Sequence, residues 1–404
     1  MQLLWHVPQY SPIGCGMSAR VRGLVAGLTA RGHALRLIAP ADGVAEPRGA
    51  VSGAVLERFD VAARPVVHWS MQALRRRWRA TDLARTALAP CDAVLTCQPE
   101  FAAAARERLS CPVVVVSCCC QLLYRAAHRA SRARHGWRTR MALRLNEHLL
   151  ERGERVGLRA AAAVAFDSAA TLGTALRGYG LAAERCHVVS PTVDVARFRP
   201  ARPHERDAMR AALELPADAF VVAWAGRMDD EKNVSLLIDA LALAGDALPA
   251  MRLLLIGDGP QRDGLARRAE YLGVTGQVRF AGRRADVERC LHAADAFALP
   301  SRVESFGIAV LEAMACGLPC VVLGEIPGVV ASGAGESVSH EQTGLVLSDA
   351  GPRSMAEAWL RLAGDAPQAA EWGRAGRARA EARHAPGRDA AELEQILERV
   401  AHRN

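Results

Sequence analysis

Short apolar runs alternate with longer stretches of helical periodicity along most of this 404-residue chain. Most of the apolar runs end at Gly, Pro or Ser, and they have the length of buried strands. This alternation predicts strand–helix–strand units, in which a parallel sheet is covered by helices on both faces. The first series predicts strands at 3–7, 35–39, 93–96, 113–117 and 161–166, with a helix at 18–30. The second predicts strands at 220–225, 252–257, 278–280, 296–299 and 320–323, with helices at 234–244, 260–272, 285–293 and 308–315.

The length of the chain exceeds that of one ordinary α/β core, so two domains are expected. Residues 190–216 are rich in proline and charge and are interpreted as the linker. We expect an N-terminal domain at 1–192, a C-terminal domain at 193–375, and a helix at 376–404 that returns to the first domain. Open parallel sheets bind ligands at the carboxyl ends of their strands, so functional residues are sought in those loops.

The basic charge of the chain is carried almost entirely by arginine and is unevenly distributed. The net charge is +8, and arginine is concentrated in residues 64–86 and 121–160. Such stretches suit phosphate, nucleic acid or an anionic membrane, or they are simply solvated helix faces. Few aromatic residues interleave with them and no nucleic-acid-binding motif occurs, so we do not expect a nucleic-acid partner.

Cysteine usage and the apolar runs point to the cytoplasm. The eleven cysteines form no Cys-x-x-Cys pair, and an odd count without a signal peptide predicts reduced thiols. The first eight residues read as a buried strand, because they lack a basic segment and a cleavage site. No apolar stretch reaches the roughly 20 residues of a membrane span. We therefore expect a cytoplasmic protein without a metal site, with peripheral contact at the inner face of the membrane as an alternative.

The only lysine of the chain is Lys232, which follows the predicted strand 220–225 together with Arg227. A lysine is a flexible point charge, whereas an arginine is a planar fork. One of each just beyond a strand predicts a clamp for a diphosphate. The simpler alternative is a chance lysine at a solvated helix start, and the adjacent Asp229-Asp230 is interpreted as a solvated turn.

A second candidate site surrounds the start of the predicted helix 308–315. Gly307 would let the backbone approach a ligand, and free amides at a helix start suit phosphate. Glu304 lies just before the helix and Glu312 lies about two turns later, roughly on the same side. Two such carboxylates suit sugar and ribose hydroxyls; the alternative is that both are ordinary surface residues.

Five stretches of the second half occur in an order and spacing typical of a known family. They are Gly226-Arg227 with Lys232-Asn233, then Ile256 to Pro260, Val278 to Arg283, Asp295 with Leu299-Pro300-Ser301, and Glu304 with Glu312 followed by Ala-Met-Ala-x-Gly-x-Pro. Together they resemble family 4 of the retaining, nucleotide-sugar-dependent glycosyltransferases. The N-terminal half resembles this family more loosely, through 8–16 and 28–33.

This resemblance implies a GT-B fold, in which two Rossmann-like domains face each other across a cleft. Arg227, Lys232 and Glu304 would form the catalytic group, with the two cations on the departing diphosphate and Glu304 on the donor sugar. The remaining donor-binding positions implied by the resemblance are Gly16, Gly257, Arg283, Ser305, Phe306, Gly307, Ile308 and Glu312. Among these, Glu312 would bond the ribose and Arg283 would lie at the base. The resemblance implies neither a metal nor a cofactor, because the nucleotide sugar is a substrate.

The sequence departs from the family at one strand end. Many members carry a histidine that faces the donor sugar, and here Cys118 occupies the aligned position. A thiol cannot donate or carry charge as an imidazole does. Cys118 is therefore a candidate sugar contact, with ordinary buried packing as the alternative. His6, His33 and His187 lie in or beside apolar strands, where core or capping positions are expected.

The sequence therefore predicts a retaining glycosyltransferase that moves a hexose or amino sugar from a nucleoside diphosphate, UDP being favoured, to an acceptor hydroxyl. Two acceptor classes remain open. One is a small natural-product or aminocyclitol core, and the other is a lipid-linked or surface-polysaccharide acceptor. A sugar-nucleotide-binding or epimerase relative without transferase activity is the alternative function.

Overall fold

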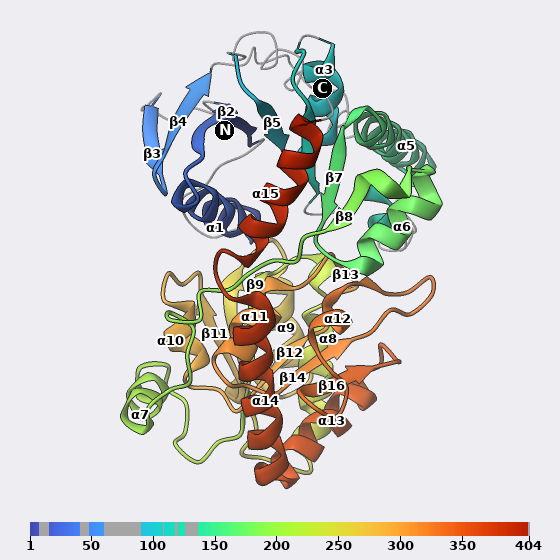
Figure 1. The fold of residues 1–404 in the computed structure, drawn as a ribbon. Helices are drawn as coiled ribbons and strands as arrows, with labels where there is room; N and C mark the ends of the chain where they lie inside the picture. The colour runs from blue at the N-terminus through green and yellow to red at the C-terminus, as the bar shows by residue number, and fades with distance from the viewer. Residues whose placement is uncertain are drawn as a thin grey trace. The chain divides into compact units, whose positions relative to one another are not determined.

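The computed structural model describes residues 1–7, 16–40, 48–59, 90–107, 109–117, 120–125 and 136–402. The chain forms two compact units, which are described separately (Figure 1). Unit 1 consists of Met1–Pro191 together with Gly387–Asn404, and unit 2 consists of Thr192–Pro386. The C-terminal end of the chain therefore belongs to the same unit as the N-terminal end.

Unit 1 is built on one sheet with the strand order β3-β4-β2-β1-β5-β6-β7-β8. The strands are β1 (Gln2–His6), β2 (Ala34–Pro40), β3 (Arg48–Val51), β4 (Ala54–Phe59), β5 (Ala93–Thr96), β6 (Val113–Ser117), β7 (Ala163–Phe166) and β8 (Cys186–Val188). All neighbouring strands are parallel except β3, which pairs with β4 in the antiparallel direction. Strands β1, β5, β6 and β7 are almost entirely buried, as expected for a sheet covered on both faces.

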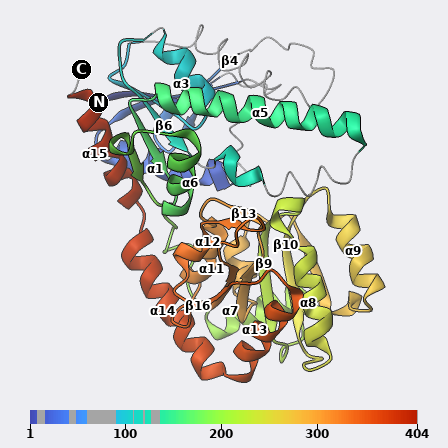
Figure 2. The same ribbon diagram turned by 90° about the vertical axis from the view of Figure 1, so that its right-hand side faces the viewer.

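The helices of unit 1 come from both ends of the sequence. They are α1 (Gly16–Ala30), α3 (Pro99–Arg106), α5 (Trp137–Ala160), α6 (Ala169–Tyr179) and α15 (Arg388–Ala401), with short 3-10 turns η2 (Gln121–Tyr124) and η3 (Ala183–Arg185). Helix α15 lies against α1, and its residues Leu393 and Leu397 are fully buried in the unit 1 core. The contact is so close that a Cβ added to Gly27 would lie 2.4 Å from the Cβ of Ala390. Helix α5 is long and runs beside α3 (Figure 2).

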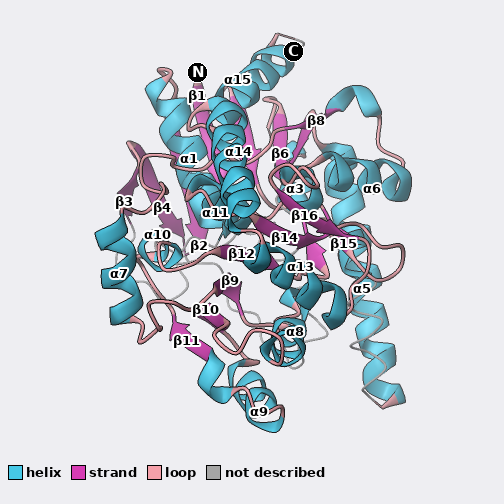
Figure 3. Cartoon of the chain, turned by 90° about the horizontal axis from the view of Figure 1, so that it is seen from below, coloured by secondary structure: helices cyan, strands magenta, loops and turns pink. Residues whose placement is uncertain are grey.

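Unit 2 has a six-stranded sheet with the order β11-β10-β9-β12-β14-β16, and all its pairs are parallel. The strands are β9 (Val221–Arg227), β10 (Arg252–Asp258), β11 (Val278–Gly282), β12 (Ala296–Leu299), β14 (Cys320–Leu323) and β16 (Gly344–Leu347), and β13 (Val303–Glu304) pairs separately with β15 (Ala331–Ser332). The helices and 3-10 turns are α7 (Pro203–Ala212), η4 (Asp230–Lys232), α8 (Ser235–Gly245), α9 (Arg262–Tyr271), η5 (Thr275–Gln277), α10 (Val287–Leu291), α11 (Ile308–Ala315), α12 (Ala334–Ser337), α13 (Pro352–Gly364) and α14 (Ala366–His384). Figure 3 shows helices on both faces of this sheet, with α8 beside α13 and α11 beside α14.

Asp295 holds the start of the unit 2 sheet to α7. Its carboxylate accepts from the backbone amide of Val221 at 2.7 Å and from the Arg210 guanidinium at 2.7 Å, and it also pairs with Arg206. Arg210 is almost fully buried, so this ion pair replaces hydration that its charge has lost. Asp295 therefore has a structural role at the end of the sheet opposite to the carboxyl ends of its strands.

Two segments differ from the expectations. Residues 376–404 do not form one helix, because α14 ends at His384 and α15 begins at Arg388. Pro386 disfavours helical backbone in the residue before it, and Gly387 takes a left-handed conformation with φ 84°. Within 190–216, interpreted as a linker, the structure has the helix α7, which begins with Pro203 and is stabilised by Glu205 at its third position.

Candidate functional site

The loops that follow β9 and β10 are joined by direct backbone contact. A Cβ at Gly257 would lie 1.8 Å from the carbonyl oxygen of Gly226, and a Cβ at Gly259 would lie 2.4 Å from that of Met228. The amide of Met228 donates to the carbonyl of Asp258 at 2.9 Å. A side chain at Gly257 would prevent this approach, so glycine is required there by the packing of β10 against β9 at the point where both strands end.

The two cations at the end of β9, Arg227 and Lys232, differ in their exposure and in their partners. Arg227 ends the strand with its side chain 70% exposed and forms an ion pair with Asp229 at 2.6 Å. Asp229 is buried, and its carboxylate accepts from the backbone amide of Lys232 at 3.2 Å, which caps the short turn η4. The expectation of a solvated turn is therefore wrong for Asp229, because this capping role takes its carboxylate out of water.

Lys232 reaches the loop after β12. Its Nζ donates to the Oε2 of Glu304 at 2.7 Å, and their side chains are 24% and 15% exposed. Burial by itself would lower the pKa of Lys232, but the carboxylate of Glu304, with Asp229 and Glu231, outweighs that effect and raises it. The amide of Arg302 donates to the carbonyl of Glu231 at 2.8 Å, so the backbone also joins these two loops.

The start of α11 lies directly after Glu304. Gly307 precedes the helix with φ 89°, a conformation that favours glycine, and Ser305 and Ile308 are half-buried on either side of it. The side chain of Phe306 points into the core and contacts the ring of His384 edge to face at 5.4 Å. Of these four predicted donor-binding residues, Phe306 can therefore contribute only its backbone at the surface.

Glu312 lies in the middle of α11 and is partly exposed. Burial raises the pKa of its carboxyl to about 7, with Arg197 acting in the opposite direction and Glu288 in the same direction. Within the part of the chain that the structure describes, no hydrogen bond or ion pair is formed by this carboxylate. A partly desolvated carboxylate with open acceptor positions suits a ligand that donates hydroxyl hydrogen bonds.

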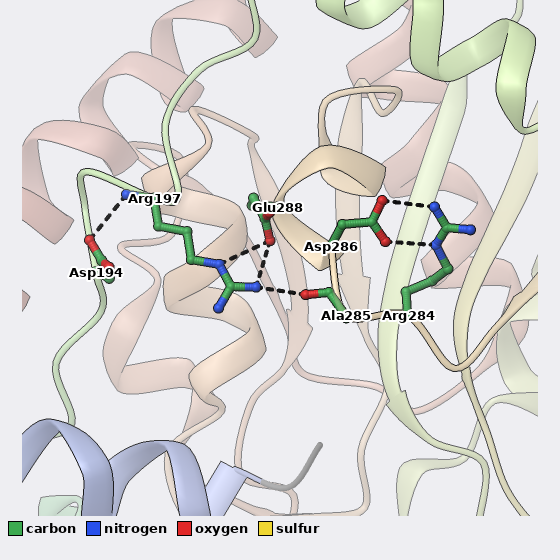
Figure 4. Close-up of polar contacts among 6 residues, drawn as sticks. All are labelled: Asp194, Arg197, Arg284, Ala285, Asp286 and Glu288. Atoms are coloured by element: carbon green, nitrogen blue, oxygen red, sulfur yellow. Dashed lines mark hydrogen bonds and ion pairs between the residues drawn. The ribbon is translucent and has the colours of Figure 1, made fainter. Parts of the chain in front are cut away.

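The segment after β11 supplies the carboxylates of two arginine–carboxylate pairs, one of which has its arginine at position 197 (Figure 4). The guanidinium of Arg197 donates to Glu288 at 3.0 and 2.7 Å and to the carbonyl of Ala285 at 2.8 Å. Arg284 binds Asp286 through two hydrogen bonds of 2.9 and 2.8 Å. Each of these carboxylates binds one arginine through two hydrogen bonds. These bonds hold the loop after β11 in one conformation.

Arg283 and its neighbour Arg284 are both exposed, but Arg283 has no hydrogen bond or ion pair with any described residue. The segment that carries Arg197 is held in place from α14, where the guanidinium of Arg377 donates to the carbonyls of Val195, Phe198 and Ala315. Arg197 belongs to none of the motifs from which site residues were predicted. Its only signal was its place inside the proline-rich segment at 190–216.

The remaining predicted positions belong to unit 1. Gly16 is the first residue of α1, and Cys118 lies outside the described residues. His6 is buried as expected, stacked on Phe101 at 3.9 Å and hydrogen-bonded to the hydroxyl of Thr96 at 2.9 Å. His33 is also buried and lies 2.8 Å from Glu394 of α15.

A buried carboxyl of α5 contacts the segment that follows β6 in unit 1. Glu154 of α5 is 3% exposed and accepts from the hydroxyl of Tyr179 and from the amide of Gln121, the latter at 2.8 Å. Burial raises the pKa of Glu154 to about 7 despite these hydrogen bonds. This residue fixes the chain where η2 begins, just past the Cys118 position.

The described ranges contain neither a metal-binding cluster nor a helix able to span a membrane. No group of three or more His, Cys, Asp or Glu residues there is placed to hold a metal ion. None of the described helices combines the length and the apolar character needed to cross a membrane.

Comparison with protein families follows the division into two units. Residues 15–192 match the model described as a glycosyl transferase 4-like domain, and residues 205–379 match the one described as glycosyl transferases group 1. The chain belongs to family 4 of the glycosyltransferases. The resemblance carried by the sequence motifs is thereby confirmed.

Several curated relatives bear the name D-inositol 3-phosphate glycosyltransferase. The one from Jonesia denitrificans is 36% identical over 188 residues, which are 44% of this chain and 43% of the relative. The one from Mycobacterium bovis is 38% identical over 177 residues, which are 41% of this chain and 35% of the relative. The matches therefore span less than half the length of these relatives.

Solved structures of the same fold match over nearly the whole chain. Sucrose-phosphate synthase from Thermosynechococcus elongatus has a TM-score of 0.80 at 21% identity, with 100% of both chains covered. Anabaena HepE in complex with UDP and glucose has a TM-score of 0.72 at 22% identity, covering 98% and 99% of the two chains. WaaG, a glycosyltransferase of lipopolysaccharide biosynthesis, has a TM-score of 0.70 at 19% identity, covering 99% and 98%. The expected fold class, two Rossmann-like units of the GT-B type, is confirmed.

Proposed function

We propose that this protein is a retaining glycosyltransferase that uses a nucleoside-diphosphate sugar, with UDP as the nucleotide and a hexose or amino sugar as the transferred group. The observation that carries the proposal is the arrangement at the ends of β9, β10 and β12. There Arg227 and Lys232 lie on one short loop, and Lys232 is paired with Glu304 at 2.7 Å. The Anabaena HepE complexes, which hold UDP, support the choice of nucleotide.

The proposed chemistry is electrostatic. Cleavage of the sugar–phosphate bond leaves negative charge on the diphosphate, and preorganised cations stabilise that charge without reorganisation. Lys232 supplies a point charge whose position Glu304 fixes, and the exposed fork of Arg227 supplies a second cation. The amides at the start of α11 add the positive end of a helix dipole. No metal is needed for this charge balance in the proposal.

The remaining donor contacts are assigned by their chemistry. The open acceptor positions of Glu312 suit the two ribose hydroxyls, and Arg283 with its neighbours lies where the base would be held. Glu304 would accept from a sugar hydroxyl with the carboxylate oxygen that Lys232 does not occupy. Gly16 would bring the first loop of unit 1 to the diphosphate, and the contact of Cys118 with the sugar stays a prediction.

The acceptor is a hydroxyl compound that unit 1 selects. The curated relatives named D-inositol 3-phosphate glycosyltransferase favour a small cyclitol over an aminoglycoside core, and a phosphorylated cyclitol suits an arginine-rich protein. A lipid-linked or polysaccharide acceptor is the second candidate.

The described cysteines are all free thiols, which supports placement of the protein in the cytoplasm.

The proposal is tested by calorimetric titration of the full chain with UDP, GDP and ADP, without metal and at fixed salt. We expect selective binding of UDP and weaker binding by Lys232→Ala. Failure of all three nucleotides to bind would refute the donor site.

A sugar-nucleotide-binding or epimerase relative is distinguished by product analysis. A transferase forms a glycoside only when an acceptor hydroxyl is added, and it then releases the nucleoside diphosphate. Conversion of the nucleotide sugar without any acceptor, and without glycoside formation, would favour the epimerase alternative.

A further inference from the structure

Helix α5 exposes a row of large apolar side chains on the face that is turned away from its unit. Trp137 is 67% exposed, Met141 61% and Leu145 60%. Their spacing of four residues places them on one side of the helix, one above the other. The opposite side buries Leu143 and Leu150, so this helix has a second apolar face in addition to the one that contacts its own core.

The core-facing side of α5 is tightly fitted, which fixes the direction of the exposed row. Helix α5 runs along α3, and a Cβ added at Gly157 would lie 1.9 Å from the carbonyl oxygen of Pro99. Rotation of the helix to bury Trp137 would break this contact. The exposed row is therefore a stable feature of unit 1.

Arginines surround the exposed row. Arg138, Arg140, Arg144, Arg152 and Arg155 are all exposed. Arg138 lies over the ring of Trp137 at 5.4 Å, and the other four have no ion pair or hydrogen bond among the described residues. Two of the three acidic residues of α5 do not neutralise them, because Glu151 is held by Arg125 through two hydrogen bonds of 2.7 Å and Glu154 is buried. The third, Glu147, leaves a clear excess of positive charge on the five arginines.

We propose that the outward face of α5 docks this protein on an anionic lipid bilayer. Trp137, Met141 and Leu145 would enter the headgroup region, and the arginines would meet lipid phosphates. An apolar row bordered by cations and lying along one helix is the pattern of an interfacial helix. This inference goes beyond the proposed transferase reaction and does not depend on it, because neither α5 face contains a proposed donor-binding residue.

Charge distinguishes a bilayer from a second copy of the chain. A symmetric contact between two α5 helices would place unpaired arginines of both copies side by side in a partly dry interface. An anionic bilayer instead neutralises each arginine, at about 1 kcal/mol or roughly fivefold in affinity per residue near the surface. The bilayer therefore fits both the apolar row and its arginine border.

The test is sedimentation of the full chain with vesicles of phosphatidylcholine alone and of phosphatidylcholine mixed with phosphatidylglycerol. We expect binding only to the anionic vesicles and release at high salt. Replacement of both Arg140 and Arg144 by Ala should lower the partition coefficient roughly 25-fold. The matched control replaces Arg353 and Arg374, which are exposed and unpaired in unit 2, and should change binding little.

The apolar row is tested with Trp137→Ser combined with Leu145→Ser, against Tyr271→Ser, an 87% exposed aromatic residue of α9. Only the first variant should lose vesicle binding. UDP titration of the same proteins distinguishes loss of vesicle binding from loss of the donor site or of the fold. A variant that binds UDP normally but does not bind vesicles supports the docking face. Equal binding to both vesicle types, or absence of binding by the unaltered protein, would overturn the proposal. A dimer in solution that becomes monomeric in the double serine variant would assign the face to a second copy instead.

Discussion

Lys232 and Glu304 lie 72 residues apart in the sequence, and their side chains meet at 2.7 Å. The pair joins the loop after β9 to the loop after β12, and both side chains are largely shielded from water. The ammonium group is therefore held in place before any ligand arrives. A group fixed in this way loses little entropy when it meets developing negative charge.

Substitution of the lysine tests this role. We expect Lys232→Ala to lower kcat about 10²- to 10³-fold, because one preorganised donor to the departing diphosphate is lost. Steady-state kinetics with UDP-sugar and the preferred acceptor would measure it. Unchanged turnover in a folded variant would show that Lys232 does not act on the leaving group.

The ion pair between Lys232 and Glu304 should also contribute to the free energy of unfolding. Lys232→Ala leaves the Glu304 carboxylate partly buried without its partner, whereas Lys232→Ala with Glu304→Gln removes both charges. We expect a coupling free energy of about 0.5–3 kcal/mol between the two substitutions in a double-mutant cycle of thermal unfolding. Strictly additive effects would mean that the ion pair contributes nothing to the fold of the loops.

Glu312 should make nucleotide binding depend on pH. Burial raises the pKa of its carboxyl to about 7 in the free protein, and in the proposed site the ribose hydroxyls would donate to the ionised carboxylate, so binding should favour the deprotonated form. UDP affinity should therefore rise between about pH 6 and pH 8, by up to roughly tenfold, and level off above that range. The phosphate of UDP titrates nearby, so Glu312→Gln is the control. The ratio of the two affinities should widen as pH rises, and a constant ratio would remove Glu312 from the site.

The joined loops should not tolerate a side chain at Gly257. A Cβ there would lie 1.8 Å from the Gly226 carbonyl oxygen, and the residue has φ 142°, so Gly257→Ala must separate the two backbones. We expect a fall in Tm of roughly 4–12 °C and weaker UDP binding. Gly264→Ala in α9 is the matched control, because open space surrounds that position. It should be neutral or slightly stabilising, by about 0.5–1 kcal/mol, since alanine favours helix. Equal effects of the two substitutions would contradict the close approach.

The buried carboxyl of unit 1 should give the unfolding free energy a pH dependence. The pKa of Glu154 is raised from 4.5 to about 7 in the folded protein, so the unfolded chain releases this proton at lower pH. Stability should therefore fall as pH rises from about 4.5 to 7, by on the order of 3 kcal/mol at most, and stay level above 7. Glu154→Gln removes this contribution. Its Tm relative to the unaltered protein should rise across that range, and a constant difference would show that the group is not shifted.

The sequence predicted the parts of the fold whose signals are local. Strands β5, β6, β12 and β14 were predicted with the bounds observed, because each is a continuous apolar run that parallel sheets bury on both faces. The positions of Lys232, Glu304 and Gly307 at loop ends followed from the same pattern. Strand β8 and the edge strand β3 were not predicted, since edge strands are short and carry mixed side chains.

Contacts between segments that are distant in the sequence could not be predicted from it. The Lys232–Glu304 pair and the capture of Arg197 by Glu288 join residues that are 72 and 91 positions apart. The periodicity of apolar residues along the sequence does not predict such a pairing, because the pairing depends on how the strands are ordered in the sheet. The sequence also does not show whether Trp137 points into the core or outward. Its direction follows from the contact between α5 and α3, which are distant in the sequence.

Helix α15 has a consequence for protein engineering. The core of unit 1 is completed by residues such as Leu393 and Leu397, although residues 192–386 intervene between this helix and the rest of the unit. A chimera that exchanges the first unit between relatives at one crossover near residue 191 would therefore pair a foreign sheet with an unmatched final helix. The first unit can be exchanged cleanly only with two crossovers, one on each side of residues 192–386, so that the final helix travels with its own sheet.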